Sequence, residues 1–260
     1  MEQTKKIYFA SDIHLGHPTL EEGRERELLF VKWLESIKQD TAELFLVGDV
    51  FDFWYEYRKV VPRGFTRTLG KLAEFTDSGI PVHFFTGNHD VWVFDYLPKE
   101  IGVKVYRRPL ETELFGKSFY IAHGDGLGPG DWSYKLLKRI FTSRILQWLF
   151  SRIHPNFALW LAHSWSNSSR FAKGIIAEEF NGEDKELSYL HAKEILNQKH
   201  FDYLIFGHRH LMVKKVIGQN AQFFILGDWL THFSYGVFDG ETFELKQFIH
   251  PESLNNSERN

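Results

Sequence analysis

The sequence predicts an α/β fold in which helices cover β-sheets, and three features of its pattern lead to this prediction. Short apolar runs of strand length alternate with amphipathic helical patterns through the first half of the chain. The last sixty residues are mostly strand-like, and polar phrases containing Asp, His or Asn follow several of the apolar runs. With 260 residues, 43% hydrophobic and 25% charged, the chain has the composition of a globular protein with a full core.

The expected elements can be placed in order along the chain. The apolar runs predicted to form buried strands are Ile7–Ala10, Leu44–Val47, Val82–Thr86, Phe119–Ala122, Tyr203–Phe206 and Phe223–Leu226. The segments with helical periodicity are Glu22–Gln39, Phe65–Ser78 and Lys185–Asn197. The first half therefore has a β-α-β-α-β order, which is typical of sheets with helices packed on them.

A basic insertion interrupts this pattern between residues 132 and 173. It contains no Asp or Glu and seven cations, so it carries +7 while the whole chain carries −3; the cations are Lys135, Lys138, Arg139, Arg144, Arg152, Arg170 and Lys173. Apolar residues recur every three to four positions from Leu136 to Ile153, which predicts one helical stripe that ends before Pro155. A second apolar helix is expected from Phe157. We therefore expect a core of residues 1–131 and 174–250, a helical cap of residues 132–173, and a flexible tail of residues 251–260.

The composition excludes several classes of protein. The chain has no cysteine, which excludes disulfides, thiolate metal sites and thiol nucleophiles. The N-terminal segment shows neither the apolar core nor the cleavage site of a signal peptide, and no apolar run approaches the ~18 residues of a membrane span. We expect a soluble, cytoplasmic protein.

Five short polar phrases carry the chemistry, and each begins where a predicted strand ends. They are Ser11-Asp12-Ile13-His14, Gly48-Asp49-Val50-Phe51-Asp52, Gly87-Asn88-His89-Asp90, His123-Gly124-Asp125 and Gly207-His208-Arg209-His210. Ligands of open α/β sheets bind beyond the carboxyl ends of the strands, so the five phrases can converge on one place. Single phrases of this kind occur by chance, but five strand-terminal ones together indicate a site.

The residue types in these phrases indicate a metal site. Asp, His and Asn without thiolate suit Mn²⁺, Fe²⁺, Zn²⁺ or Mg²⁺. In the pairs Asp12/His14 and His208/His210, residues two apart in extended backbone point to the same side. A carboxylate such as Asp49 can bridge two cations, and two cations ~3.5–4 Å apart can activate water for in-line attack on phosphorus.

The order and spacing of the five phrases resemble those of the calcineurin-like metallophosphoesterases. The motifs span Asp12 to His210, most of the chain. The resemblance implies a four-layer α/β/β/α sandwich with two metal ions. It assigns Asp12, His14, Asp49 and His210 to the first ion, and Asp49, Asn88, His123 and His208 to the second. His89 would face the phosphate as a stabiliser or proton donor, with Asp90 as a possible orienting partner, and Asp49 and His89 would be the catalytic residues.

The insertion leaves three interpretations open. Its cations and four tryptophans suit a membrane surface with anionic lipid, or nucleic acid bound through phosphates and stacking. The aliphatic stripe favours lipid, because acyl chains need apolar walls and nucleotides do not. The third interpretation is a helical hairpin that only packs on the core, with its cations in solvent.

Three features are similar to one branch of the family, the UDP-2,3-diacylglucosamine hydrolases of lipid A biosynthesis. They are Gly48-Asp49-x-x-Asp52-x-Trp54, the helical insertion after His123-Gly124-Asp125, and the Asn- and Ser-rich segment Ser164–Ser169. The resemblance implies hydrolysis of the pyrophosphate of a lipid-linked UDP-sugar to UMP and 2,3-diacylglucosamine 1-phosphate. It also implies peripheral contact with the cytoplasmic face of the inner membrane, no nucleic-acid partner, and Mn²⁺ as the metal.

The same branch suggests substrate-binding residues. Asp131 and Tyr134 fit an Asp-x-x-Tyr pair that helps bind the product, and Ser166, Arg170 and Lys173 fit a Ser-x-x-x-Lys-x-x-Lys pattern with Arg for the first Lys. Asn88, His89 and His208 are expected to touch substrate as well. The alternative for the cap residues is ordinary helix capping and surface chemistry.

At one position the sequence departs from this branch. Many members of the branch carry Arg where this chain has His89, and an imidazole can donate a proton whereas Arg stays charged.

Two alternative functions are compatible with the sequence. The first alternative is a phosphodiesterase or nucleotide pyrophosphatase acting on a soluble substrate. The second is a metal-free scaffold, which the complete set of donors disfavours. The sequence leaves the oligomeric state open.

Overall fold

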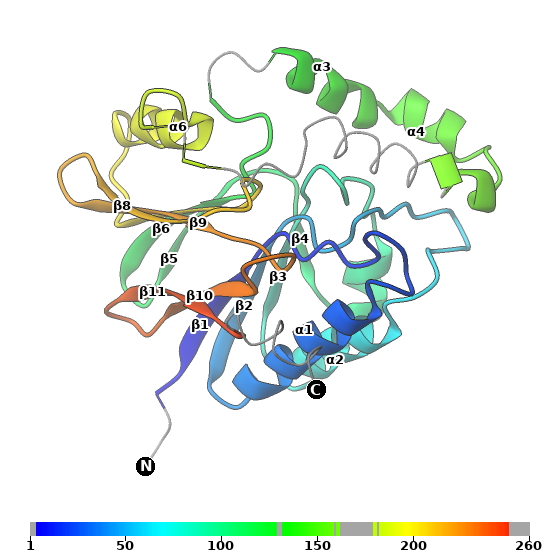
Figure 1. Ribbon diagram of the computed structural model, residues 1–260, viewed down its shortest axis with the longest axis horizontal. Coiled ribbons are helices and arrows are strands. Elements are labelled where there is room, and N and C mark those ends of the chain that lie inside the picture. Colours follow the sequence, from blue (N-terminus) through cyan, green and yellow to red (C-terminus); the bar gives the residue numbers. More distant parts are fainter. Residues whose placement is uncertain (1–3, 129–131, 159, 162–178, 181, 250–260) are drawn as a thin grey trace, which may run out of the picture.

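The protein is described by a computed structural model that covers residues 4–128, 132–158, 160–161, 179–180 and 182–249. Its architecture is a four-layer sandwich, with two sheets packed face to face and helices on their outer faces (Figure 1). The predicted α/β fold is therefore confirmed.

The first sheet has six strands in the order β11-β10-β1-β2-β3-β4. Their bounds are β1 Lys6–Ala10, β2 Thr41–Val47, β3 Val82–Phe85, β4 Lys104–Tyr106, β10 Ser234–Phe238 and β11 Phe243–Gln247. Strands β1 to β4 are parallel, whereas β10 pairs antiparallel with both β1 and β11. The outer face of this sheet is covered by α1 (Arg24–Ile37) and α2 (Thr66–Asp77), and the short π-helix η1 (Leu97–Ile101) packs beside α2.

The second sheet has five strands in the order β5-β6-β7-β9-β8. Their bounds are β5 Leu110–Leu114, β6 Lys117–Ala122, β7 Tyr203–Phe206, β8 Met212–Ile217 and β9 Ala221–Leu226. The central strands β6, β7 and β9 are parallel, and the edge strands β5 and β8 are antiparallel to their neighbours. Helix α6 (Leu187–Leu196) covers the outer face of this sheet.

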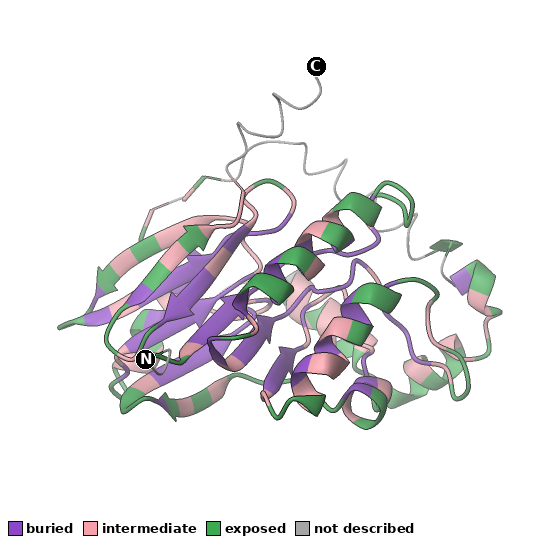
Figure 2. Ribbon diagram, turned by 90° about the horizontal axis from the view of Figure 1, so that it is seen from below, coloured by how far each residue is buried: buried purple, intermediate pink, exposed green. Residues whose placement is uncertain are grey.

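Three apolar layers hold the sandwich together. Large side chains such as Trp33 and Phe75 fill the space between the first sheet and its helices, and α6 packs on the second sheet through Tyr189 and Ala192. Between the sheets, Phe9 stacks on Phe45 within the first sheet and on Phe119 of the second. Figure 2 shows the central strands as almost continuously buried, which explains why most of their residues are apolar on both faces rather than at alternate positions.

The insertion begins with two short helices, α3 (Trp132–Phe141) and α4 (Arg144–Phe150), above the strand ends (Figure 1). The prediction of one stripe from Leu136 to Ile153 was wrong, because the helix breaks at Thr142 and Ser143. Ser143 is extended (φ −67°, ψ 120°). The carbonyl of Phe141 leaves the helical pattern and accepts from Trp92 Nε1 (2.7 Å) and Gln147 Nε2 (2.9 Å).

Candidate metal centre

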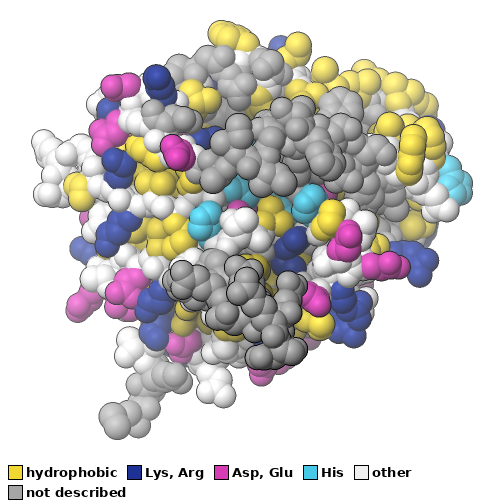
Figure 3. Space-filling model, in the orientation of Figure 1, with side chains coloured by type: hydrophobic (Ala, Val, Ile, Leu, Met, Phe, Trp, Pro, Cys, Tyr) yellow, Lys and Arg dark blue, Asp and Glu magenta, His cyan; other side chains and the backbone are white. Residues whose placement is uncertain are grey.

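The candidate site lies where six parallel strands of the two sheets end. The polar side chains that follow β1, β2, β3, β6, β7 and β9 are Asp12, His14, Asp49, Asn88, His89, His123, His208, His210 and Asp228. Figure 3 shows histidines near the middle of this face of the molecule. The convergence follows from topology, because the carboxyl ends of parallel strands meet at one edge.

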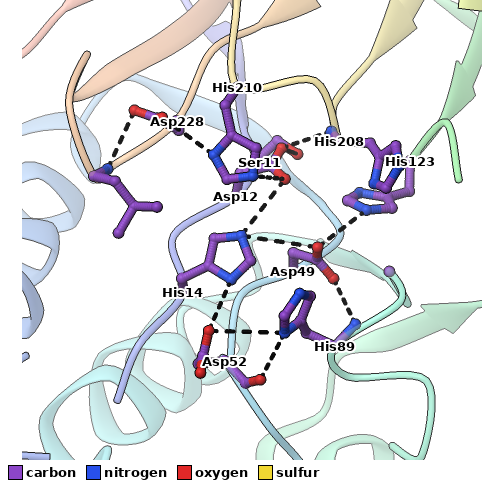
Figure 4. Close-up of polar contacts among 12 residues, drawn as sticks. Ser11, Asp12, His14, Asp49, Asp52, His89, His123, His208, His210 and Asp228 are labelled. Atoms are coloured by element: carbon purple, nitrogen blue, oxygen red, sulfur yellow. Dashed lines mark hydrogen bonds and ion pairs between the residues drawn. The ribbon is translucent and has the colours of Figure 1, made fainter. Parts of the chain in front are cut away.

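The first group of donors surrounds Asp12. Asp12, His14 and His210 offer ligand atoms that all lie within 4.8 Å of one another. Asp12 Oδ1 lies 3.8 Å from His14 Nε2 and 3.6 Å from His210 Nε2, as Figure 4 shows. Donor atoms bound to one ion at about 2.1 Å lie about 3–4 Å apart, so these distances fit a shared cation.

The second group surrounds Asp49. Asp49, His123 and His208 also offer atoms within 4.8 Å of one another. Asp49 Oδ2 lies 3.4 Å from His123 Nε2 and 3.8 Å from His14 Nε2. The Asp49 carboxylate therefore stands between the two groups, where it can bridge two ions.

Buried polar atoms without a hydrogen-bond partner support this assignment. Within the described residues, Asp12 Oδ1, Asn88 Oδ1 and His123 Nε2 are buried and accept or donate no hydrogen bond. Such atoms are costly in a folded protein unless something else satisfies them. All three belong to residues that the sequence predicted as metal ligands, and a cation would satisfy all three.

Four of the five imidazoles around the centre are oriented through their Nδ1 atoms, which leaves Nε2 for the centre. His123 Nδ1 donates to the carbonyl of Val47 (2.8 Å), and His89 Nδ1 donates to the carbonyl of Asp52 (2.8 Å). Carboxylates hold the other two rings: Asp52 Oδ1 lies 3.3 Å from His14 Nδ1, and Asp228 Oδ2 lies 3.2 Å from His210 Nδ1. Partners of this kind fix the tautomer of metal-binding histidines.

Two of these orienting groups, the carboxylates of Asp52 and Asp228, were not predicted from the sequence. Asp52 belongs to a phrase that was singled out, but no role was assigned to it. Asp228 follows the apolar run of β9 in the phrase Gly227-Asp228, the same pattern as Gly48-Asp49. That sixth strand-terminal phrase was the signal that could have found it.

The expectation that Asp90 orients His89 is not supported by the contacts in the structure. Asp90 Oδ2 accepts from the backbone N–H of Val50 (2.9 Å), and Oδ1 accepts from that of Gly87 (2.7 Å). Asp90 therefore joins the loop after β2 to the loop after β3. It positions the backbone on which Asp49 and His89 stand.

Burial and mutual attraction shift the pKa values of the cluster. Burial raises the pKa of Asp12. Burial acts in the same sense on Asp49, but the imidazoles of His123, His89 and His14 hold its pKa well below its usual range. Burial opposes protonation of His123, yet Asp49 outweighs it and raises the pKa of His123 to about 10, whereas burial lowers that of His208 to about 3. The negative charge of Asp49 is thus the main cause of the raised pKa of His123, and a divalent cation is a second group that can balance this charge.

The backbone around the ligands is strained. Five of the predicted ligands adopt the left-handed region, namely Asp12 (φ 55°), His14 (47°), Asp49 (52°), His208 (69°) and His210 (48°). The expectation that the pairs Asp12/His14 and His208/His210 lie in extended backbone was therefore wrong, because both pairs lie beyond the strand ends. Non-glycine residues adopt this region at a cost of about 1–3 kcal/mol each, and such strain concentrates at functional sites. Hydrogen bonds hold it in place: the N–H of His208 donates to Asp12 Oδ2 (2.8 Å) and that of His89 to Asp49 Oδ1 (2.9 Å).

Glycines that precede the ligands allow this close packing. A Cβ at Gly87 would lie 2.2 Å from Asp49 Oδ1, and one at Gly207 would lie 2.0 Å from Ser11 Oγ. A Cβ at Gly48 would lie 2.3 Å from His123 Nδ1. The glycines of these three phrases are therefore required by the neighbouring phrase, and Gly48 (φ 89°) also has a backbone conformation that favours glycine.

Comparison with known proteins agrees with this geometry. The family model for calcineurin-like phosphoesterases matches residues 5–212, a range that contains all seven predicted metal ligands. The chain belongs to this family. It is therefore a metal-dependent phosphoesterase, and the His and Asp clusters described above form its candidate active site.

Three curated relatives of this phosphoesterase carry the same name. The chain is 41% identical to the UDP-2,3-diacylglucosamine hydrolase of Porphyromonas gingivalis, in a match that covers 93% of this chain and 97% of the relative. The hydrolase of the same name from Histophilus somni is 28% identical, with 86% and 92% of the two chains covered. That from Haemophilus influenzae is 26% identical, with 88% and 93% covered.

The predicted substrate-binding residues of the cap are only partly described. Asp131, Ser166, Arg170 and Lys173 lie outside the described residues. The hydroxyl of Tyr134 donates to Asp125 Oδ2 (2.7 Å), and its ring centroid lies 6.2 Å from that of His208. Tyr134 therefore stands at the edge of the candidate metal centre.

Helices α3 and α4 rest on an aromatic surface of this phosphoesterase beside the site. The hydroxyl of Tyr55 donates to the carbonyl of Gln147 (2.7 Å), and the ring of Phe150 packs on Tyr55 and Trp92 with centroid distances of 4.7 and 4.8 Å. Lys138 forms an ion pair with the buried Asp125 (2.6 Å), which ties α3 to the loop that carries His123.

Proposed function

We propose that this phosphoesterase hydrolyses the pyrophosphate bond of UDP-2,3-diacylglucosamine, giving UMP and 2,3-diacylglucosamine 1-phosphate. The observation that carries the proposal is the match to the P. gingivalis hydrolase. It covers 93% of this chain, and the unmatched remainder is shorter than the insertion at residues 132–173. The similarity therefore extends from the metal-site core into the insertion, the region that distinguishes substrates in this proposal.

Two divalent ions are part of the proposal. Asp12, His14, Asp49 and His210 would hold the first, and Asp49, Asn88, His123 and His208 the second. We expect Mn²⁺, with Fe²⁺, Zn²⁺ and Mg²⁺ as the alternatives that the oxygen and nitrogen donors allow. Such ions supply an activated water and stabilise charge on phosphoryl oxygens.

His89 is proposed to contact the phosphate. Because its Nδ1–H donates to the carbonyl of Asp52, Nε2 remains for a phosphoryl oxygen or for the leaving group. Asn88, its neighbour in the chain, and His208, which belongs to the group around Asp49, are proposed to contact the same phosphate. When protonated, the imidazole can also deliver a proton to the departing oxygen.

The cap is proposed to receive the acylated sugar and to contact the cytoplasmic face of the inner membrane. In this proposal, residues 132–173 form the cap, residues 1–131 and 174–250 form the core, and Asp131, Tyr134, Ser166, Arg170 and Lys173 help bind the product. On α3 and α4, large apolar side chains are exposed, among them Trp132 (81%), Ile145 (72%) and Leu136 (61%). Exposed apolar residues beside cations are typical of helices that lie on anionic lipid surfaces. Within the described residues, no helix has the length and apolar character needed to cross a bilayer.

The test of the reaction is turnover of UDP-2,3-diacylglucosamine with added Mn²⁺, beside bis(p-nitrophenyl) phosphate as a generic phosphodiester. We expect metal-dependent release of UMP with little action on the generic ester. Hydrolysis of the generic ester alone would support a phosphodiesterase with a soluble substrate instead.

The membrane contact is tested by cosedimentation with vesicles of phosphatidylethanolamine and phosphatidylglycerol. We expect Ile145→Glu to weaken binding about tenfold or more, because it places a charge on the apolar face of α4. Val216→Glu is the matched control, since Val216 is similarly exposed (67%) on β8, away from α4 (Figure 1). Equal binding by wild type and Ile145→Glu would contradict the proposed surface.

A further inference from the structure

A cavity of about 490 Å³ lies next to the candidate metal centre but contains none of its ligands. We propose that it binds the nucleoside half of the substrate; this inference rests on the proposed function. The volume falls in the range of about 300–1,000 Å³ that is typical of small-molecule sites. Its wall comes from the loop after β1, the start of α1, and the loop before α2.

The position of the cavity suits a group attached directly to a metal-bound phosphate. Two of its lining residues are Leu15, which follows His14, and Phe53, which follows Asp52. The two segments are paired, since the N–H of Asp52 donates to the carbonyl of Leu15 (2.9 Å). The segments that carry the ligand His14 and its partner Asp52 therefore continue directly into the wall of the cavity.

Hydrogen bonds hold the part of the wall that follows β1. Nη1 of Arg26 donates to the carbonyls of His14 (2.9 Å) and His17 (3.0 Å), which fixes the loop after β1. The N–H of Gly23 donates to the carbonyl of Thr19 (2.9 Å) and closes that loop onto the start of α1. A cavity with fixed walls costs little ordering when it binds a ligand.

The chemistry of the lining favours a nucleoside over an acyl chain. Glu21, Arg24 and Arg63 bring three charged side chains to the cavity, and Phe53 and Phe65 bring aromatic rings. Charged groups would lose solvation against a hydrocarbon chain. A nucleoside instead offers hydroxyls to a carboxylate, carbonyl oxygens to guanidinium groups, and a flat base to aromatic rings.

These three charged side chains are available for a ligand. Within the part of the chain that the structure describes, no side-chain hydrogen bond or ion pair engages Glu21, Arg24 or Arg63. The fourth ionisable residue of the lining, Glu27, is already occupied, because its Oε1 accepts from the backbone N–H groups of Arg67 and Thr68. Recognition therefore falls to the first three.

Phe53 separates this cavity from the cap. Its ring lies 5.8 Å from that of Trp92 and 6.5 Å from that of Phe150, both of which belong to the aromatic contact between core and cap. The two halves of the substrate would then diverge at the metal centre. The acylated sugar would run towards α3 and α4, and the nucleoside would run into the cavity on the other side of Phe53.

The test compares binding of UMP and of ribose 5-phosphate, which lacks the base, to the Mn²⁺-loaded enzyme by titration calorimetry. We expect wild type to prefer UMP, and the double variant Glu21→Ala/Arg63→Ala to reduce that preference about tenfold. Leu20→Trp, which fills the cavity from its exposed rim, should reduce it similarly. The matched control is Glu25→Ala/Arg58→Ala, two exposed residues of the same types outside the lining, and it should retain the preference.

The outcomes separate this inference from the proposed function. An unchanged preference in both cavity variants, or an equal loss in the control, would overturn the cavity assignment. A raised KM for the lipid substrate with an unchanged preference for UMP would also overturn it, since the cavity would then hold the acylated half. Failure of wild type to hydrolyse the lipid substrate would overturn the proposed function, while the comparison of UMP with ribose 5-phosphate would still decide whether the cavity binds a nucleoside.

Discussion

At the scale of single residues, Asp49 is the side chain on which both halves of the metal centre depend. Its Oδ2 lies between His123 Nε2 and His14 Nε2. We expect Asp49→Ala to lower kcat by about 10³-fold or more, because the bridge between the ions is lost. The measurements are turnover and metal content by elemental analysis. Asp77→Ala, which removes an exposed carboxylate at the end of α2, is the control, and near-normal activity of Asp49→Ala would refute the two-metal assignment.

Asp228 is not a predicted metal ligand, but it orients the imidazole of the predicted ligand His210. The change Asp228→Asn weakens the acceptor for His210 Nδ1 but keeps an oxygen for the backbone N–H groups of Thr231 and His232. We expect metal affinity to fall about 10–100-fold, as is usual when the partner of a ligating histidine is changed. Competition with a metal chelator measures this, and excess metal should restore turnover.

A suitable control for Asp228→Asn is Asp239→Asn. Asp239 also accepts backbone N–H groups in a turn, those of Glu241 and Thr242, but it lies on the exposed turn between β10 and β11. Its variant should keep wild-type metal affinity. Equal affinities for wild type and Asp228→Asn would show that His210 needs no partner or is not a ligand.

At the scale of elements, the junctions between strands and loops decide whether the ligands meet. We expect Gly207→Ala to destabilise the fold by about 1–3 kcal/mol, because its Cβ would lie 2.0 Å from Ser11 Oγ and force the β7 loop away from β1. It should also weaken metal binding, since Ser11 donates to Asp12 Oδ2 (2.6 Å). Denaturant unfolding and chelator competition measure the two effects.

The matched substitution is Gly70→Ala in the middle of α2. No atom lies within 4 Å of a Cβ built there, and alanine is favoured over glycine in a helix by about 0.5–1 kcal/mol. Gly70→Ala should therefore stabilise the protein and leave metal binding unchanged. Opposite signs for the two variants are the expected result; a stabilising Gly207→Ala would contradict the packing of the strand ends.

The sequence was sufficient to predict the buried parallel strands β1, β2, β3, β6, β7 and β9. It predicted neither the edge strands nor β10, which lies inside the first sheet and contains Ser234 and Gly236. The last four residues of β2 and of β9 are buried on both faces, so these segments are continuous apolar runs and are easily found. In the edge strands β4, β5, β8 and β11, buried and exposed positions alternate or the strand is partly exposed. Their segments therefore contain polar residues and do not form recognisable apolar runs. The break between α3 and α4 was missed for another reason: it depends on Trp92, which is distant in sequence and binds the carbonyl of Phe141.

At the metal centre, too, some features could be predicted from the sequence and others could not. The predicted ligands within the described residues come together because each stands at the end of a buried parallel strand, a pattern visible in sequence. The partners that orient them do not share one signal. Val47 orients His123 and Asp52 orients His89 through backbone carbonyls, which any residue type could supply, so no sequence pattern identifies these two contacts. The carboxylates of Asp52 and Asp228, by contrast, belong to phrases that follow strands.

At the scale of the whole molecule, the two sheets form one site only because their strand ends are held against each other. The N–H of His208 on the second sheet donates to Asp12 on the first, and His123 Nδ1 donates to the carbonyl of Val47 across the same gap. Ions held by Asp12, Asp49, His123 and His208 would therefore link the two sheets as well as complete the site. Metal binding and stability of the fold should be coupled.

This coupling leads to a prediction for the intact protein. Metal at about 100 times its Kd should stabilise the fold by about 2.7 kcal/mol, which for a chain of this size corresponds to a rise in Tm of about 5–10 °C. Thermal unfolding of chelator-treated protein, with and without added Mn²⁺, measures the shift. Asp49→Ala should show a much smaller one, because one donor is shared by both ions, whereas Asp77→Ala should respond like wild type. A Tm that is independent of metal in wild type would mean that the strand ends are held together without ions, and that the strain at Asp12 and His208 is balanced by hydrogen bonds alone.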